Sequence, residues 1–105
     1  MIARIWTART TSPDDADTYQ CLFRDDVLVH LRAVPGFRDA LLLRRDHGTG
    51  AEFMTITLFD SRAAVRGFAG DDDEAAAVSD RARAVLDDVD ERVRHFTVAV
   101  HENPQ

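Results

Sequence analysis

The stretch "ALLLRRDHGTGAEFMTITLFD", residues 40–60, predicts two strands joined by a tight turn at two glycines that can take positive φ angles. Side chains of a strand alternate between the two faces of its sheet. The first strand holds three consecutive leucines, residues 41–43, and therefore places leucine on both faces. The second strand has one face with Phe53, Thr55, Thr57 and Phe59 and an opposite face with Met54, Ile56 and Leu58. Both faces of this hairpin therefore need cover.

A strand and a helix are predicted before the hairpin. Residues 2–10 alternate as a strand does, and residues 12–33 form a helix with Ser12 as N-cap and Pro13 at its first position. Apolar side chains recur in the helix at steps of three and four residues, which predicts one buried stripe. The stripe consists of Ala16, Tyr19, Phe23, Val27, His30 or Leu31, and Val34. The Pro-Gly pair that follows ends the helix.

Two helical segments and a strand are predicted after the hairpin. A helix begins after Ser61, a second helical stretch covers about residues 74–89, and a last strand covers residues 92–101. This order predicts an α+β, ferredoxin-like βαββαβ fold, in which a four-stranded antiparallel sheet carries its helices on one face. We expect a single domain over residues 1–105, with a flexible tail at 101–105.

The face that the helices leave bare would be a large apolar patch, which monomers rarely expose. A second copy of the chain, packed sheet to sheet, would cover it. The sequence therefore predicts a homodimeric α/β barrel.

Composition excludes several kinds of partner and chemistry. A net charge of -6 and a pI of about 5.0 argue against nucleic acid and against an anionic membrane surface. All 13 basic residues are arginine, so Schiff-base and pyridoxal-phosphate chemistry has no lysine to use. The single cysteine, Cys21, excludes an intramolecular disulfide and a cysteine-based zinc cluster. The chain shows no export signal and no apolar run near the ~20 residues of a membrane span, so we expect a cytoplasmic protein.

Four segments carry a resemblance to a known family: "MIARIW", "AVPGFRDALLLRR", "ITLFDSRAAVRGFAG" and "DERVRHFTV". The order and spacing of these segments resemble those of the antibiotic biosynthesis monooxygenase-like family of small dimeric α/β-barrel proteins. The resemblance extends from Met1 to Val100. The resemblance implies the fold and the dimer. Members include cofactor-independent oxygenases of aromatic polyketides and haem-degrading enzymes, and related dimeric barrels include polyketide cyclases.

The haem-degrading branch is tested against its own residues. Its iron-binding histidine would fall at about Ala77 or Val78, its distal asparagine near Trp6, and its tryptophan near Phe68. The only asparagine of the chain is Asn103, in the tail. All three positions depart from that pattern, so haem degradation is not expected.

The candidate catalytic residues are His95, His30 and Trp6. His95 lies in the last predicted strand, where an imidazole with a pKa near ~6.5 suits a general base, although it also suits a histidine bonded to a neighbouring carbonyl. His30 is a second candidate base, or it stabilises the C-terminal end of its helix. Trp6 can stack on a planar ligand, or it belongs to the core.

The candidate substrate-binding residues include aromatic and polar side chains. Phe37, Phe53 and Phe68 offer an apolar lining, although core packing also explains them. Thr55 and Thr57 share a pattern with His95 that fills a sheet face poorly and leaves room for a ligand. Arg4, in a strand otherwise read as buried, extends its charge to the edge of the sheet, pairs with an acid, or meets an anionic substrate. Whether this face lies under the helices or at the dimer interface stays open.

We expect an oxygenase that uses no metal and no organic cofactor. Its substrate would be an aromatic polyketide or a similar phenol or anthrone, because such a molecule reduces dioxygen itself once it is deprotonated. Two alternatives remain: a polyketide cyclase or isomerase on the same fold, and a dimer that binds a small molecule without catalysis.

Overall fold

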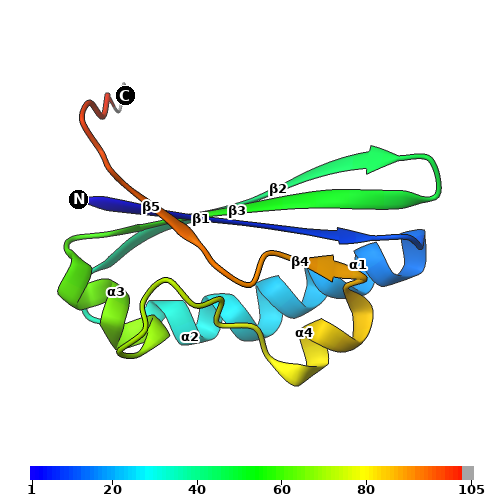
Figure 1. Ribbon diagram of the computed structural model, residues 1–105, viewed down its shortest axis with the longest axis horizontal. Helices are drawn as coiled ribbons and strands as arrows, with labels where there is room; N and C mark the ends of the chain where they lie inside the picture. The colour runs from blue at the N-terminus through cyan, green and yellow to red at the C-terminus, as the bar shows by residue number, and fades with distance from the viewer. Residues whose placement is uncertain (103–105) are drawn as a thin grey trace.

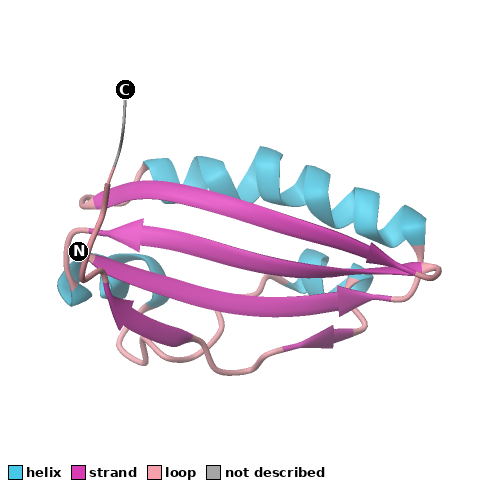
Figure 2. Ribbon diagram, turned by 90° about the horizontal axis from the view of Figure 1, so that it is seen from above, coloured by secondary structure: helices cyan, strands magenta, loops and turns pink. Residues whose placement is uncertain are grey.

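An antiparallel sheet forms one layer of the computed structural model, which describes residues 1–102, and every helix of these residues lies against one face of it (Figures 1 and 2). The strands are β1 (Ile2–Thr10), β2 (Phe37–His47), β3 (Gly50–Phe59), β4 (Asp88–Val89) and β5 (Arg94–Thr97). The order is β2-β3-β1, and β4 and β5 both pair with the other edge of β1. The predicted ferredoxin-like α+β fold with helices on one face is confirmed.

The hairpin of β2 and β3 closes at Gly48, whose φ of 60° suits the first central position of a two-residue turn. His47 pairs with Gly50 across this turn and is the last residue of β2. A Cβ at Gly50 would stand 2.1 Å from the carbonyl oxygen of Thr10, so only glycine fits where the hairpin crosses the end of β1.

The first helix is continuous but changes character in its middle. It consists of α1 (Pro13–Leu22), a π-helical turn η1 (Phe23–Val27) and α2 (Leu28–Arg32). The predicted N-cap is confirmed, because the Ser12 hydroxyl accepts a hydrogen bond from the Asp15 backbone N–H at 3.2 Å. The π-helical turn inserts one residue, so eight residues instead of seven separate the buried Phe23 from the buried Leu31.

Two short helices follow the hairpin: α3 (Arg62–Ala69), capped by the Ser61 hydroxyl, and α4 (Asp80–Val85), capped by the Ser79 hydroxyl. The predicted helix over 74–89 is therefore wrong at both ends. Residues 74–76 form backbone hydrogen bonds with residues 91–93 instead, from Ala76 N–H to Glu91 and from Val93 N–H to Glu74. Alanine and valine at helical spacing do not form a helix where another segment of the chain already forms hydrogen bonds with their backbone N–H and C=O groups.

The predicted last strand, 92–101, is also too long. β5 ends at Thr97 because β1 begins at Ile2, and the last bond of this edge joins the Val98 N–H to the Met1 carbonyl. Beyond it the chain turns away from the sheet (Figure 1). Residues 101 and 102 are in neither helix nor strand, and residues 103–105 lie outside the described residues. The single domain and the flexible tail stay predictions.

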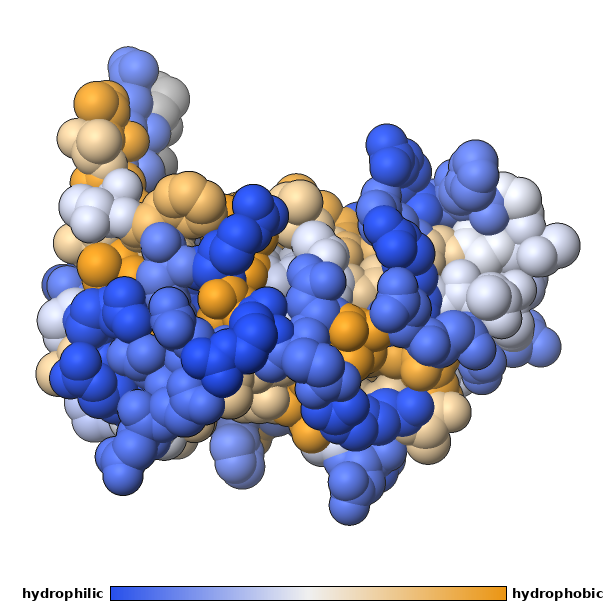
Figure 3. Space-filling model, viewed as in Figure 1, coloured by the Kyte–Doolittle hydropathy of each residue, from blue (hydrophilic) through white to orange (hydrophobic). Residues whose placement is uncertain are grey.

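The face of the sheet away from the helices is apolar. Leu41 and Leu43 on β2 are 48% and 44% exposed, and Phe96 on β5 is 49% exposed. Cross-strand register places Met54, Ile56 and Leu58 of β3 and Ala3, Ile5 and Thr7 of β1 between them. We call this set the open face. In Figure 3, which has the view of Figure 1, hydrophobic side chains reach the surface of the sheet layer at the top. Hydrophilic side chains dominate the surface of the helix layer below it.

Between sheet and helices the core is divided into two clusters. One centres on Tyr19 and Phe53 and reaches α4, and the other centres on Leu31, Phe59 and Val65. Within residues 1–102, no helix is long and apolar enough to cross a membrane.

Candidate functional site

A cavity of about 310 Å³ lies between the sheet and the helices, bounded by the two core clusters. Its floor follows from the register of β1 and β3. Trp6 pairs with Thr55 and Arg4 pairs with Thr57, whereas the flanking pairs on the same face include Phe53 and Phe59, which are fully buried. Short hydroxyl side chains in the middle of a face whose ends carry phenylalanine leave space between sheet and helix. The mixed polar face predicted from sequence therefore lies under the helices.

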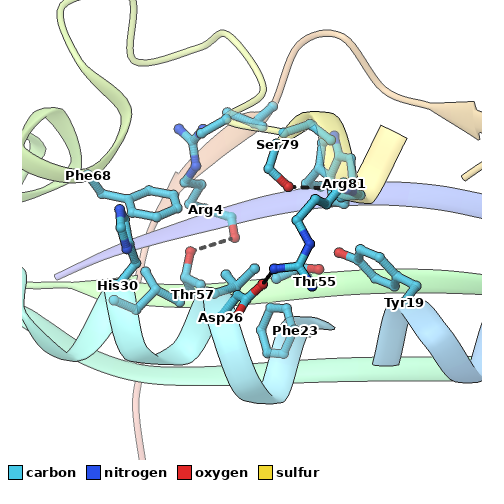
Figure 4. Close-up of a pocket in the computed structure, with 17 residues that line it drawn as sticks. Arg4, Tyr19, Phe23, Asp26, His30, Thr55, Thr57, Phe68, Ser79 and Arg81 are labelled. Atoms are coloured by element: carbon cyan, nitrogen blue, oxygen red, sulfur yellow. Dashed lines mark hydrogen bonds and ion pairs between the residues drawn. The ribbon is translucent and has the colours of Figure 1, made fainter. Parts of the chain in front are cut away.

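The wall of the cavity comes from every layer of the fold. β1 and β3 supply the floor, α1, η1 and α2 supply one side, and α3, α4 and the preceding loop supply the other (Figure 4). The lining residues most relevant to chemistry are Arg4, Trp6, Tyr19, Asp26, His30, Thr55, Thr57, Phe68 and Arg81. Most of the remaining lining is aliphatic or aromatic, which is the composition of small-molecule sites.

Arg4 is a buried cation held by backbone oxygens. Its guanidinium donates to the carbonyls of Asp73 and, at 2.9 Å, Ala75, and it lies 5.8 Å from the centre of the Phe68 ring. Burial lowers the pKa of Arg4 to about 10, with Asp73 opposing the drop and Arg62 adding to it. The group therefore keeps its charge at neutral pH, and it ties the loop before α4 to the floor of the cavity.

His95 lies behind Arg4 and outside the cavity wall. Its Nε2 is 3.2 Å from an Arg4 nitrogen that can only donate, so Nε2 accepts and the ring is neutral with its proton on Nδ1. The buried Nδ1 has no hydrogen-bond partner among the described residues. Burial lowers the pKa of His95, and the positive charges of Arg62 and Arg4 lower it further, against the opposing effect of Asp73 and Glu74.

One end of the cavity carries two buried hydroxyl groups. The Thr55 hydroxyl is buried and has no hydrogen-bond partner within residues 1–102. Burial raises the pKa of Tyr19 to about 12, and the nearby Thr55 hydroxyl opposes this rise without reaching hydrogen-bond geometry. The Trp6 ring lies 6.4 Å from the Tyr19 ring, and its N–H donates to the Asp90 carbonyl at 2.6 Å. This end therefore combines aromatic walls with one buried hydroxyl group, that of Thr55, which has no partner among the described residues.

The other end contains His30 beside Phe68, with Arg4 and Thr57 nearby (Figure 4). His30 is exposed, because the extra residue of η1 gives the buried position of the helix to Leu31. The ambiguity between His30 and Leu31 in the predicted stripe is thus resolved. Leu31 packs in the core and His30 stands at the mouth of the cavity, in the last turn of α2.

An ion pair stands across the cavity from one helix to another. Arg81 of α4 donates through one nitrogen to a carboxylate oxygen of Asp26 on η1 at 2.8 Å, and both side chains are largely exposed. The two residues are 55 positions apart, so no sequence pattern connects them.

The structure brings together six of the nine predicted site residues and separates three. Those that line the cavity are Arg4, Trp6, His30, Thr55, Thr57 and Phe68. Phe53 is fully buried against Tyr19, Phe37 packs on Phe59, and His95 lies behind Arg4. Sequence reasoning missed Tyr19, Phe23, Asp26 and Arg81, of which the first two were read as core because they fit the helical stripe.

The site offers little to hold a metal ion. Among the described residues, no group of three or more histidine, cysteine, aspartate or glutamate side chains lies close enough to bind one. Ala77 and Val78, where the resemblance would place an iron-binding histidine, line the cavity and carry no ligand atom.

Comparisons with solved structures place the fold in a known class. The chain is similar to a monooxygenase from the gene ActVA-Orf6 of Streptomyces coelicolor, solved with nanaomycin D, at 17% identity and a TM-score of 0.68 over 99% of this chain and 92% of that one. A mutant of MhuD, solved with two manganese protoporphyrin IX molecules bound per active site, matches at 21% identity and a TM-score of 0.69, over 99% of this chain and 100% of that one.

A third solved structure is named for antibiotic biosynthesis monooxygenases and comes from Bacillus cereus. It matches at 13% identity and a TM-score of 0.69, over 100% of this chain and 97% of that one. No protein-family model and no curated protein matches the chain. The chain therefore has the fold of the antibiotic biosynthesis monooxygenase-like proteins, and the predicted resemblance is confirmed at the level of the fold.

Proposed function

We propose that this protein is a monooxygenase that oxidises an aromatic polyketide, or a similar phenol or anthrone, with dioxygen and without a metal or organic cofactor. The observation that carries the proposal is the cavity itself. It is apolar enough for a polycyclic ring system, and it has a histidine at one end and the aromatic rings of Trp6 and Tyr19 with the Thr55 hydroxyl at the other. The fold shared with monooxygenases of antibiotic biosynthesis supports the same reaction class.

The proposed step begins with a proton. His30, at the cavity mouth, takes a proton from the activated CH₂ group of an anthrone, and the electron pair stays in the conjugated enolate. The enolate transfers one electron to dioxygen, and the resulting radicals combine at that carbon to form a C–O bond. The resulting peroxide anion takes the proton back from His30 and becomes a hydroperoxide. The carbon then loses its second hydrogen as a proton, the electron pair of that C–H bond forms the new C=O bond, and the O–O bond breaks to release hydroxide. Hydroxide and the proton combine to water, so that anthrone and dioxygen give anthraquinone and water. Dioxygen is reduced and the carbon is oxidised.

Arg4 would stabilise the negative charge of the enolate, because its guanidinium is charged, buried and fixed by two backbone carbonyls. Since His95 contacts Arg4 and stands outside the cavity wall, we assign it a positioning role. Trp6 and Phe68 would hold the planar ring system between them, and Thr57 lies on the floor below.

The proposal includes a homodimer formed through the open face. A twofold axis would bring the same apolar patch of two chains together, and one self-complementary contact would then cover all of it. The charged pairs Arg9–Glu52 and Arg45–Glu52 lie at the edge of this patch, as polar groups do at the rim of an interface. A cytoplasmic location stays a prediction.

Oxygen uptake with anthrone as substrate tests the function. We expect protein-dependent uptake above the uncatalysed rate, and one atom of ¹⁸O from labelled dioxygen in the quinone, measured by mass spectrometry. His30→Gln should lower kcat by about 10²-fold or more, whereas His47→Gln, at the far end of the hairpin, should not change it. Binding of anthrone without oxygen uptake would contradict the oxygenase and favour a cyclase or a binding protein.

A further inference from the structure

The ion pair between Asp26 and Arg81 is weakly held. Its two side chains are 51% and 73% exposed, and ion pairs between exposed side chains add little stability because water screens their charges. A guanidinium has five N–H donors, and the contact with Asp26 uses one nitrogen of Arg81. The remaining donors of Arg81 have no partner among the described residues, so a second anion can bind there at small cost.

The pair also belongs to the cavity and not only to its surface. Both residues line it, as do Thr55 and Tyr19, and in Figure 4 the Arg81 side chain runs from α4 toward Asp26. His30 and Phe68 lie at the opposite end. Arg81 thus offers a cation to a ligand at the end of the cavity that lies opposite His30.

We propose that Arg81 is the anchor for an acidic substituent of the substrate, a carboxylate or a phenolate, and that Asp26 holds Arg81 in place and competes for it. This inference rests on the proposed function, because it assumes an aromatic ligand in the cavity. It narrows the substrate to polycyclic aromatic acids, whose acidic group binds at Arg81 and whose reacting carbon then lies toward His30. Arginine suits this task because its fork can bind a carboxylate through two parallel hydrogen bonds.

The two variants that break the ion pair have opposite expected effects. Arg81→Gln removes the cation and should weaken binding of an aromatic carboxylate by about tenfold or more. Asp26→Asn removes the competing anion and a repulsive charge, and should tighten the same binding two- to fivefold. A pair that only holds η1 to α4 would give changes of the same sign in both variants.

Fluorescence provides the measurement, because the only tryptophan of the chain, Trp6, lines the cavity. The probes are anthraquinone-2-carboxylate and its neutral analogue anthraquinone-2-carboxamide, titrated into wild type, Arg81→Gln and Asp26→Asn at pH 7.5. We expect the Kd of the carboxylate to rise in the first variant and fall in the second, with the Kd of the carboxamide within twofold in all three. Circular dichroism and the Tm of each variant check that it folds.

Each failure has its own pattern. Equal Kd values for the carboxylate in wild type and Arg81→Gln, or equal losses for both probes, would overturn the anchor and leave the oxygenase intact. If neither probe quenched Trp6 in the wild type, the aromatic cavity site would be wrong, and the anchor would fall with it.

Discussion

Gly50 shows how one residue fixes the approach of two strands. A Cβ there would meet the Thr10 carbonyl oxygen at 2.1 Å and its carbonyl carbon at 3.1 Å, both in the backbone. Gly48, two residues earlier, has a φ of 60° but nothing within 4 Å of a Cβ. The two glycines of the turn therefore serve different purposes, close approach at Gly50 and backbone conformation at Gly48.

Gly50→Ala should lower the free energy of unfolding by about 2–3 kcal/mol, because the clash is with main chain that cannot rotate away. Gly48→Asn is the matched control, since asparagine tolerates positive φ and meets open space, and it should cost less than about 1 kcal/mol. Urea denaturation of both variants measures the difference. Equal losses would mean that the backbone of β1 gives way at Thr10.

His95 predicts a pH dependence of stability. Its pKa is lowered in the folded protein by burial first and then by Arg62 and Arg4, so the unfolded chain binds a proton more readily. The contribution of His95 to stability is therefore complete above the ordinary histidine pKa of about 6.5, and it is lost as the pH falls from there toward the folded pKa.

The Tm of the wild type should thus fall more steeply between pH 7.5 and 5.5 than the Tm of His95→Gln. His47→Gln, altered at an exposed position, should follow the wild type. Parallel curves for wild type and His95→Gln would show that the ring is protonated as easily in the folded protein as in the unfolded chain.

At the scale of elements, the long helix explains why His30 and Leu31 could not be told apart from the sequence. Seven residues after Phe23, an unbroken α-helix would bury His30, and the extra residue of η1 moves that place to Leu31. Nothing in "FRDDV" marks a π-helical turn. The caps at Ser12 and Ser61 were predictable, because a serine before an acidic or alanine-rich turn is a local signal.

The loop before α4 was not predictable, because its structure depends on distant residues. The Ala75 carbonyl accepts a hydrogen bond from Arg4, the Ala76 N–H donates to the Glu91 carbonyl, and Ala75 forms an isolated bridge with Arg92. No local sequence pattern predicts these contacts. The pairing of Asp26 with Arg81 was hidden for the same reason. The floor of the cavity was predictable, since Thr55 and Thr57 stand out among phenylalanines.

Arg4→Gln should release this loop. We expect the free energy of unfolding to fall by about 2 kcal/mol, because two charge-assisted hydrogen bonds to backbone carbonyls are lost. Hydrogen exchange should become faster at the amides of Ala76 and Val93, which bond within the same segment. Arg9→Gln, which removes only exposed ion pairs, should cost less than about 0.5 kcal/mol. Unchanged exchange at Ala76 would mean that the loop is held without Arg4.

At the scale of the whole molecule, the helices cover one face of the sheet and the open face remains apolar. The leucines of residues 41–43 made this visible from the sequence, because alternation must send some of them outward. Which face would hold the cavity was not visible, since both faces are largely apolar and the polar side chains of Arg4, Thr55, Thr57 and His95 suit a dimer interface as well as a space under the helices. Only the packing of the helices over one face of the sheet decides which face holds the cavity.

Leu41→Arg should separate the proposed dimer, because it would bury a charge in an apolar contact, and it should raise the dimer Kd at least a hundredfold. Sedimentation velocity at micromolar concentration measures the effect. Val29→Arg, at an exposed apolar residue of α2, should leave the dimer unchanged. A wild type that sediments as a folded monomer would refute the dimer itself.

The π-helical turn η1 lies between two helices that are anchored separately. Because α1 and α2 are each anchored by their own buried residues, Tyr19 and Leu31, the five residues between them can lose or gain one position without undocking either half. Three of those five, Phe23, Asp26 and Val27, line the cavity. A single-codon deletion would return the helix to ordinary winding and present a different set of side chains to the cavity. The lining of the cavity would therefore change through one such deletion while the sheet and the other helices keep their places.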